Sequence, residues 1–214
     1  MQELGLFCGT FNPIHLGHLL IAESARVDFA LEKVLFVVSP EPPHRRLNLL
    51  SGEDRYTMVV AACQGNSFFV PSRLELDRPG PSYTVDTVRA VKDIYPGHRI
   101  NLIIGGDNLA TLNTWHEAEA LVELARLLVV PRLKISAANK SETRDNKAEK
   151  LFEKDQDLIQ SDLLKKADVN FVDFPGVAIS ASSIRKRIQE NKSVLYMVPP
   201  AVAEIISTEG FYSK

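Results

Sequence analysis

Short apolar runs alternate along this chain with longer stretches in which apolar residues recur every three or four positions. The short runs are typical of buried strands, and the periodic stretches are typical of helices that pack one face on a sheet. We predict strands at residues 4–8, 34–38, 100–104, 127–130 and 169–174, and helices at 16–30, 53–63, 83–94 and 118–124. This alternation predicts a doubly wound, Rossmann-like α/β fold: a mainly parallel sheet, helices on both faces, and ligands at the carboxyl ends of the strands.

Two segments depart from the alternation. Residues 68–70 and 72–76 look extended, but Pro71 lies between them and lacks the N–H of a central strand, so we expect an edge strand or a loop. Residues 134–166 are rich in charge and carry leucines spaced for one or two surface helices. We interpret them as a helical insertion in a single domain of residues 1–214, because the part that follows is short for a second core. A linker between two domains is the alternative.

Composition narrows the class of protein. A chain of 214 residues with 45% hydrophobic residues can bury one substantial core. Its formal net charge of −2 gives no overall positive field for nucleic acid, so any anion site has to be local. Cys8 and Cys63 lack metal or disulfide spacing, and neither a signal peptide nor a membrane-spanning apolar run is found. We therefore predict a soluble, cytoplasmic protein that binds neither nucleic acid nor membrane.

The turn between the first strand and the first helix, residues 9–18, reads Gly-Thr-Phe-Asn-Pro-Ile-His-Leu-Gly-His. A helix start offers backbone N–H groups and the positive end of the helix dipole, which attract phosphate. Gly9 lets the backbone approach closely, and His15 and His18 share one face and can donate to phosphate oxygens. A helix-capping histidine beside a half-buried one is the alternative. A zinc pair is disfavoured because no third ligand has suitable spacing.

A second helix start follows the last predicted strand, at residues 179–185. Ser180 is a good N-cap, Ser182 and Ser183 can hold phosphate, and Arg185 adds a permanently charged, forked donor. Simple capping with a solvated arginine is the alternative, because serine-rich helix starts are common. Two such helix starts in one α/β chain favour phosphate binding.

These two segments resemble the (H/T)xGH and ISSTxxR signatures of the nucleotidyltransferase superfamily. Further matches lie between and after them: residues 42–45 resemble a PPHK element, residues 78–84 contain a Pro-Ser-Tyr-Thr run, Gly105-Gly106-Asp107 with Trp115 resembles a GxD…W block, and residues 196–199 resemble a Y-(I/L)-V-P element. Together they resemble the bacterial nicotinate mononucleotide adenylyltransferases over essentially the whole chain.

The sequence departs from that family at four places. The family usually has Gly-Gly at 8–9, Asp at 12, Lys at 45 and Ser-Thr at 181–182, where this chain has Cys8-Gly9, Asn12, Arg45 and Ala181-Ser182. Asn12 cannot act as a carboxylate, and Ala181 removes one hydroxyl from the phosphate site. The charged insertion is also longer than the family's usual form.

The resemblance implies that the acceptor's 5′-phosphate attacks the α-phosphorus of ATP in line and releases pyrophosphate, with no covalent intermediate. It implies that His18 contacts the α-phosphate, that His15 contacts the ATP phosphates, and that Arg185 with Ser182 and Ser183 holds the leaving pyrophosphate. The expected ATP-binding residues are Gly9, Thr10, Phe11, Arg45, Gly106, Asp107, Ser180, Ser182 and Ser183. The expected acceptor-binding residues are His44, Tyr83, Thr84 and Trp115. Mg²⁺ is expected to travel with ATP, held by phosphate and water rather than by a protein metal site.

Several of these residues have simpler alternatives. Asp107 and Thr84 could cap helices, and Trp115 could be a core residue. Another acceptor, such as phosphopantetheine or a sugar or choline phosphate, is the first rival substrate, and an ATP-sensing module without turnover is the rival class. The sequence does not choose firmly between nicotinate and nicotinamide mononucleotide, and it leaves a homo-oligomer open.

Overall fold

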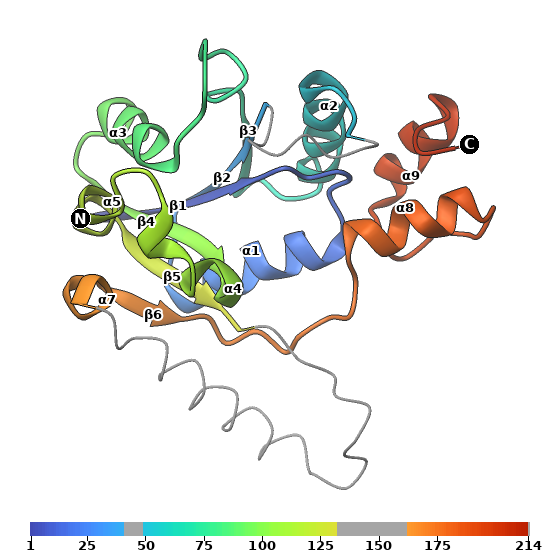
Figure 1. The fold of residues 1–214 in the computed structure, drawn as a ribbon. Helices are drawn as coiled ribbons and strands as arrows, with labels where there is room; N and C mark the ends of the chain where they lie inside the picture. The colour runs from blue at the N-terminus through green and yellow to red at the C-terminus, as the bar shows by residue number, and fades with distance from the viewer. Residues whose placement is uncertain (41–48, 132–161, 214) are drawn as a thin grey trace, which may run out of the picture.

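A six-stranded, all-parallel sheet in the order β3-β2-β1-β4-β5-β6 organises the residues that this computed structural model describes, namely 1–40, 49–131 and 162–213 (Figure 1). The strands are β1 Gln2–Gly9, β2 Lys33–Val38, β3 Phe69–Ser72, β4 His98–Gly105, β5 Arg126–Val130 and β6 Val169–Phe171. Strands β2 and β3 lie on one side of β1, and strands β4, β5 and β6 lie on its other side. The switch point therefore lies between β1 and β4, where doubly wound folds bind ligands at the carboxyl ends of the strands.

Helices cover both faces of the sheet (Figure 1). They are α1 Leu16–Asp28, α2 Gly52–Cys63, α3 Thr84–Ile94, α4 Gly106–Leu109, the 3₁₀ turn η1 Leu112–Thr114, α5 Ala118–Leu124, α7 Asp162–Lys166, α8 Ala181–Gln189 and α9 Pro200–Thr208. Along β2, Val34 and Phe36 enter the core beneath α1, α2, α8 and α9, whereas Leu35 and Val37 enter the core beneath α3 and α5. Burial on both faces explains why the strands are continuous apolar runs.

The observed elements follow the predicted pattern closely. The doubly wound fold is confirmed, and Pro71 lies within β3, an edge strand that pairs only with β2 among the described strands. The predicted strand 169–174 ends earlier, at Phe171, and the helix predicted to reach residue 30 ends at Asp28. Of the predicted insertion 134–166, α7 is described as a helix, and the remainder lies outside the described residues. Within the described part of the chain, no helix is both long and apolar enough to cross a membrane.

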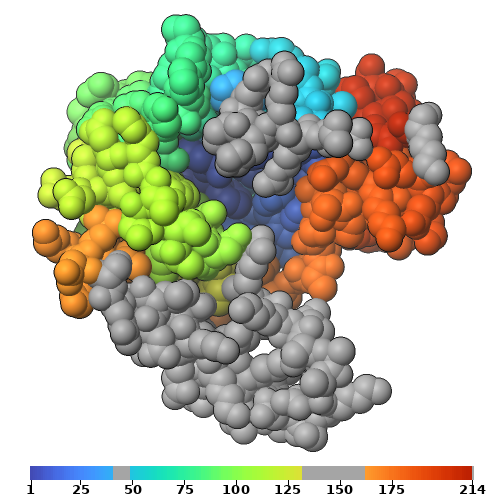
Figure 2. All heavy atoms as spheres, viewed as in Figure 1, coloured from blue at the N-terminus to red at the C-terminus, as the bar shows by residue number. Residues whose placement is uncertain are grey.

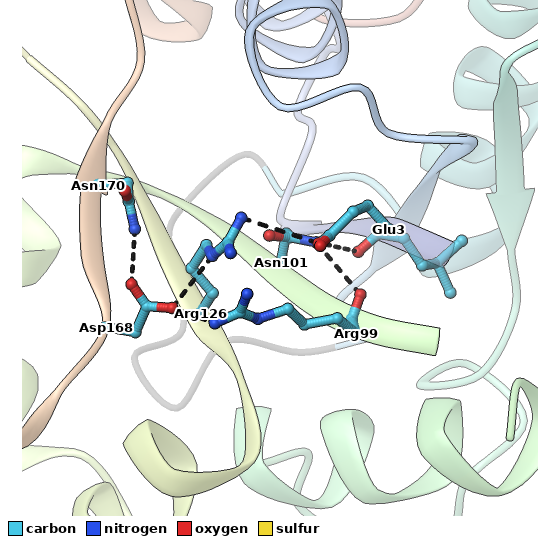
Figure 3. Close-up of polar contacts among 7 residues, drawn as sticks. Glu3, Arg99, Asn101, Arg126, Asp168 and Asn170 are labelled. Carbon is cyan, nitrogen blue, oxygen red and sulfur yellow. Dashed lines mark hydrogen bonds and ion pairs between the residues drawn. The ribbon is translucent and has the colours of Figure 1, made fainter. Parts of the chain in front are cut away.

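A polar network joins the amino ends of β1, β4 and β5 to the residue that precedes β6, away from the switch point (Figure 3). Asn101 on β4 donates through Nδ2 to Oε2 of Glu3 on β1 at 2.7 Å, and Arg126 Nη1 on β5 lies 3.8 Å from the same oxygen. Arg126 Nε also donates to Oδ2 of Asp168 at 3.1 Å, and Arg99 pairs with Asp168 as well. Burial alone would raise the pKa of Asp168, but the hydrogen bonds and cationic neighbours outweigh it and lower that pKa. We name this set the amino-edge network.

Candidate active site

The two histidines of the β1–α1 turn form one stacked pair. His15 is the N-cap of α1 and His18 is the third residue of its first turn, and their ring centroids lie 3.7 Å apart at an interplanar angle of 22°. The His15 backbone N–H donates to His18 Nδ1 at 3.2 Å. Because Nδ1 accepts, a neutral His18 carries its proton on Nε2, which makes that nitrogen a hydrogen-bond donor. His15 therefore occupies the N-cap position, although its side chain makes no capping hydrogen bond, and the two rings share one face of the helix start.

Burial keeps both imidazoles neutral. His15 is only 6% exposed, and burial lowers its pKa to about 4. Burial, and then the neighbouring His15, lower the pKa of His18 well below its usual value. Phe11 and Phe7 lie edge-on to the His18 ring, with centroids 5.1 and 6.1 Å away. The pair can therefore donate hydrogen bonds at neutral pH without carrying charge.

Gly17 provides the room that the His15 ring occupies. A Cβ atom at position 17 would lie 3.0 Å from His15 Nδ1 and 3.1 Å from its Cε1, tighter than ordinary van der Waals contact. One face of the ring also stacks on His18, which limits where the ring can move. The glycine between the two histidines is thus a packing requirement of the pair.

Two arginines hold the loop that precedes the histidines. Arg185 Nη1, from α8, donates to the backbone oxygen of Asn12 at 2.6 Å, so the alternative of a solvated arginine is wrong. Arg55 on α2 is fully buried and donates to the backbone oxygens of Thr10 and Ser39, each at 2.7 Å, and of Leu50 at 3.0 Å. Arg55 was not predicted as a site residue, although its place on the apolar face of a helix was a signal.

The start of α8 is a serine capping box, as predicted for Ser180. Ser180 Oγ accepts from the Ser183 N–H at 3.2 Å, and Ser183 Oγ donates to the Ser180 backbone oxygen at 2.7 Å. The Ser182 side chain is exposed, with its Oγ 3.1 Å from that of Ser180. The capping alternative is therefore confirmed for Ser180, and Arg185 connects this helix start to the β1–α1 loop.

A small cavity of about 150 Å³ lies between the carboxyl ends of β1 and β4. Thr84, Trp115 and Gly105 line it, together with Cys8. Burial and the nearby Glu75 raise the pKa of the Cys8 thiol, which therefore stays protonated. Figure 2 shows the N-terminal residues, in blue, recessed between the green β4–α4 region and the orange α8 region.

The helix-cap alternatives for Thr84 and Asp107 are wrong. Tyr83 is the N-cap of α3 and Gly105 is the N-cap of α4, so Thr84 and Asp107 lie inside their helices. A Cβ at Gly105 would lie 2.6 Å from Asp107 Oδ1, so this glycine makes room for that carboxylate. Tyr83 stacks on His116, with ring centroids 4.1 Å apart, and no motif in the sequence indicated this partner.

The other predicted residues are placed as follows. Trp115 both packs against the core and lines the cavity, so its core alternative and its predicted place are compatible. Phe11 is 3% exposed, so the residue as a whole is buried beside the histidine pair. Gly106 is the buried first residue of α4, close to Asp107. His44 and Arg45 lie outside the described residues.

A larger hollow, of about 560 Å³, is found at the β3 edge of the sheet. Arg73, Arg78 and Tyr95 are among its lining residues, and none of the predicted site residues lines it. We therefore place the candidate site at the switch point. Among residues 1–40, 49–131 and 162–213, no three His, Cys, Asp or Glu side chains are grouped as a metal site requires.

Comparisons with known proteins identify the relatives of this chain. The model of the cytidylyltransferase-like family matches residues 6–187. A probable nicotinate-nucleotide adenylyltransferase of Thermus thermophilus is 39% identical over 99% of this chain and 100% of its own length. One from Desulfitobacterium hafniense is 36% identical over 99% of this chain and 96% of its own length.

Solved structures share the fold. A nicotinic acid mononucleotide adenylyltransferase of Plasmodium falciparum, complexed with NaAD, has a TM-score of 0.73 at 15% identity, covering 99% of this chain and 98% of that one. A putative nicotinate-nucleotide adenylyltransferase of Vibrio parahaemolyticus has a TM-score of 0.67 at 21% identity, and the match covers 99% of this chain and 96% of that one. With full-length relatives above 30% identity and the predicted fold in place, this chain belongs to the nicotinate-nucleotide adenylyltransferase family of cytidylyltransferase-like proteins.

Proposed function

We propose that this protein transfers AMP from ATP to nicotinate mononucleotide and releases pyrophosphate, as a cytoplasmic enzyme of NAD biosynthesis. The observation that carries the proposal is the contact between Arg185 and Asn12, which joins the histidine turn to the serine-rich helix start. Both helix starts thus serve one anion site, next to a ring-sized cavity. The names of the full-length relatives supply the acceptor.

The proposed reaction is a single in-line displacement. An oxygen of the acceptor's 5′-phosphate forms a bond to the α-phosphorus of ATP, the bond from that phosphorus to the bridging oxygen breaks, and pyrophosphate leaves with its electron pair. Catalysis of this type depends on positioning and on stabilising charge rather than on a nucleophilic side chain.

Different residues of the site contact different phosphate groups of ATP. His18, neutral and protonated on Nε2, donates to an α-phosphate oxygen, and His15 donates to the ATP phosphates. Arg185 contacts the leaving pyrophosphate with the donors that its bond to Asn12 does not use. Because the Ser183 N–H already donates to Ser180 Oγ, the first-turn N–H groups of Ala181 and Ser182 are the ones presented to phosphate.

The remaining assignments complete the ATP side. Backbone groups of Gly9, Thr10 and Phe11 line the phosphate path, and Gly106 and Asp107 meet the nucleoside, with Asp107 accepting from ribose hydroxyls. We assign Arg45 to the phosphates and His44 to the acceptor by resemblance alone. Mg²⁺ enters as the counter-ion that ATP carries, because the described residues do not form a metal cage.

The acceptor's pyridine ring is assigned to the 150 Å³ cavity. A cavity of about this volume can hold a benzene-sized ring. Trp115 would stack on the ring, and the start of α3 at Tyr83 and Thr84 would receive the carboxylate, an anion suited to a helix N-terminus.

Pyrophosphate release by the purified protein tests this function. ATP and Mg²⁺ are supplied with nicotinate mononucleotide, nicotinamide mononucleotide or phosphopantetheine, and nicotinate mononucleotide should give by far the highest kcat/KM. His18→Ala should lower kcat by about 100-fold through loss of a preorganised donor. His98→Ala, at the amino end of the sheet, is the matched control and should keep full activity. ATP binding without turnover would support the sensing module instead, and release with another acceptor alone would overturn the substrate assignment.

A further inference from the structure

Asn12 lies where three segments that are remote in the sequence meet. Its side-chain Oδ1 accepts from the hydroxyl of Tyr212, beyond α9, at 2.7 Å and from the Leu50 N–H at 3.5 Å. Its backbone oxygen accepts from Arg185 at 2.6 Å. Asn12 and Tyr212 are 7% and 8% exposed, so water competes little for these bonds.

The side-chain and backbone hydrogen bonds of Asn12 are mechanically coupled. Its side chain and its carbonyl belong to one residue, so fixing Oδ1 against Tyr212 also fixes the direction of the oxygen that Arg185 reaches. Burial raises the pKa of Tyr212, so the hydroxyl remains a donor throughout the neutral range. A guanidinium is planar, and one committed N–H therefore sets the direction of the others.

Neighbouring contacts limit how far a loss at Tyr212 can spread. Arg55 independently holds the Thr10 carbonyl, two residues before Asn12, at 2.7 Å. Removing the Tyr212 hydroxyl should therefore loosen the Asn12 side chain without unfolding the β1–α1 loop. This makes an effect on geometry separable from an effect on stability.

We propose that Tyr212 and Asn12 are positioning residues that aim the Arg185 guanidinium at the leaving pyrophosphate. The inference rests on the proposed function for the identity of the anion, and it adds a contact from the far end of the fold to the site. Tyr212 touches neither substrate, and its influence passes through Asn12 to Arg185.

Tyr212→Phe tests the proposal, with Tyr95→Phe as the matched control because Tyr95 lies at the β3-edge hollow. Loss of one buried hydrogen bond should lower kcat and weaken inhibition by pyrophosphate by about tenfold each. The KM for the acceptor should stay within about twofold, since that cavity does not depend on Arg185. The control should leave all three constants unchanged. Unaltered pyrophosphate inhibition in Tyr212→Phe, with only a lower melting temperature, would show a purely structural role and overturn the proposal.

A double-mutant cycle identifies the route. If Tyr212 acts through Arg185, then adding Tyr212→Phe to Arg185→Ala should lower neither kcat nor pyrophosphate inhibition further. Independent roles would instead give additive losses in both. Asn12→Asp keeps the acceptor oxygen, so its dissociation constant for pyrophosphate should stay within about threefold of the parent's.

Pyrophosphate binding measured by calorimetry separates this inference from the proposed function. A parent protein that binds pyrophosphate but makes no dinucleotide would refute the function, while the comparison with Tyr212→Phe would still decide the positioning role. Equal binding by the parent and Tyr212→Phe would refute the positioning role, whatever the parent's activity.

Discussion

Gly17→Ala should separate activity from stability. The new Cβ would lie 3.0 Å from His15 Nδ1, so the ring must move by a few tenths of an ångström against the stacked His18. Alanine is favoured over glycine in a helix by about 1 kcal/mol, and overpacking of this kind costs about 1–3 kcal/mol. The two effects oppose each other, so the free energy of unfolding should change by no more than about 2 kcal/mol.

Activity should respond more strongly. A misplacement of about 1 Å can cost about 100-fold in rate, so a shift of a few tenths should lower kcat/KM by about tenfold. The assay is steady-state pyrophosphate release, combined with urea unfolding of the same preparation. Gly65→Ala is the matched control, because a Cβ there meets no atom within 4 Å. If Gly17→Ala turns over like the parent, the His15 ring is not held as tightly as the reasoning requires.

Three further predictions address burial and substrate contacts. Burial lowers the pKa of His15 from 6.5 to about 4, so the unfolded chain binds the proton first as pH falls. The free energy of unfolding should therefore drop by about 3 kcal/mol between pH 6.5 and 4. Urea unfolding at several pH values should show that His15→Gln lacks this part of the pH dependence. Arg55→Met leaves buried carbonyls unpaired and should cost about 3 kcal/mol, a fall in melting temperature of about 6–12 °C by calorimetry, whereas the surface change Lys92→Met should have little effect. Trp115→Leu should raise the KM for nicotinate mononucleotide about tenfold and leave the KM for ATP unchanged, and equal effects on both would contradict stacking on the acceptor.

Element types were predictable because their apolar periodicity is strong, whereas element ends depend on contacts that the pattern does not contain. The predicted last strand stops at Phe171, and the Asp173 N–H donates to Oδ2 of Asp28 on α1 instead of to a strand. Helix α1 ends early because Ala30 adopts a left-handed backbone, with φ of 49°, where no glycine signals a stop.

The site was predictable where a helix start dictates the chemistry. His15, His18 and Ser180 lie at helix starts, and the structure places them there. Arg55 and Tyr212 were not predicted, because a charged residue in an amphipathic helix and a tyrosine beyond the last helix are usually solvated. Their partners are backbone and amide oxygens 45 and 200 residues away in the sequence, which only the folded chain brings near.

The amino-edge network also bears on what this fold tolerates between β5 and β6. Arg126 and Asp168 fix the pairing of these two strands at the end opposite to where their connection leaves the sheet, so the alignment does not depend on the connection's length. The entropy of loop closure rises by only about 0.6 kcal/mol for each doubling of the loop length. A longer or shorter connection should therefore cost little free energy, and a peptide inserted between the two strands should leave the strand order unchanged.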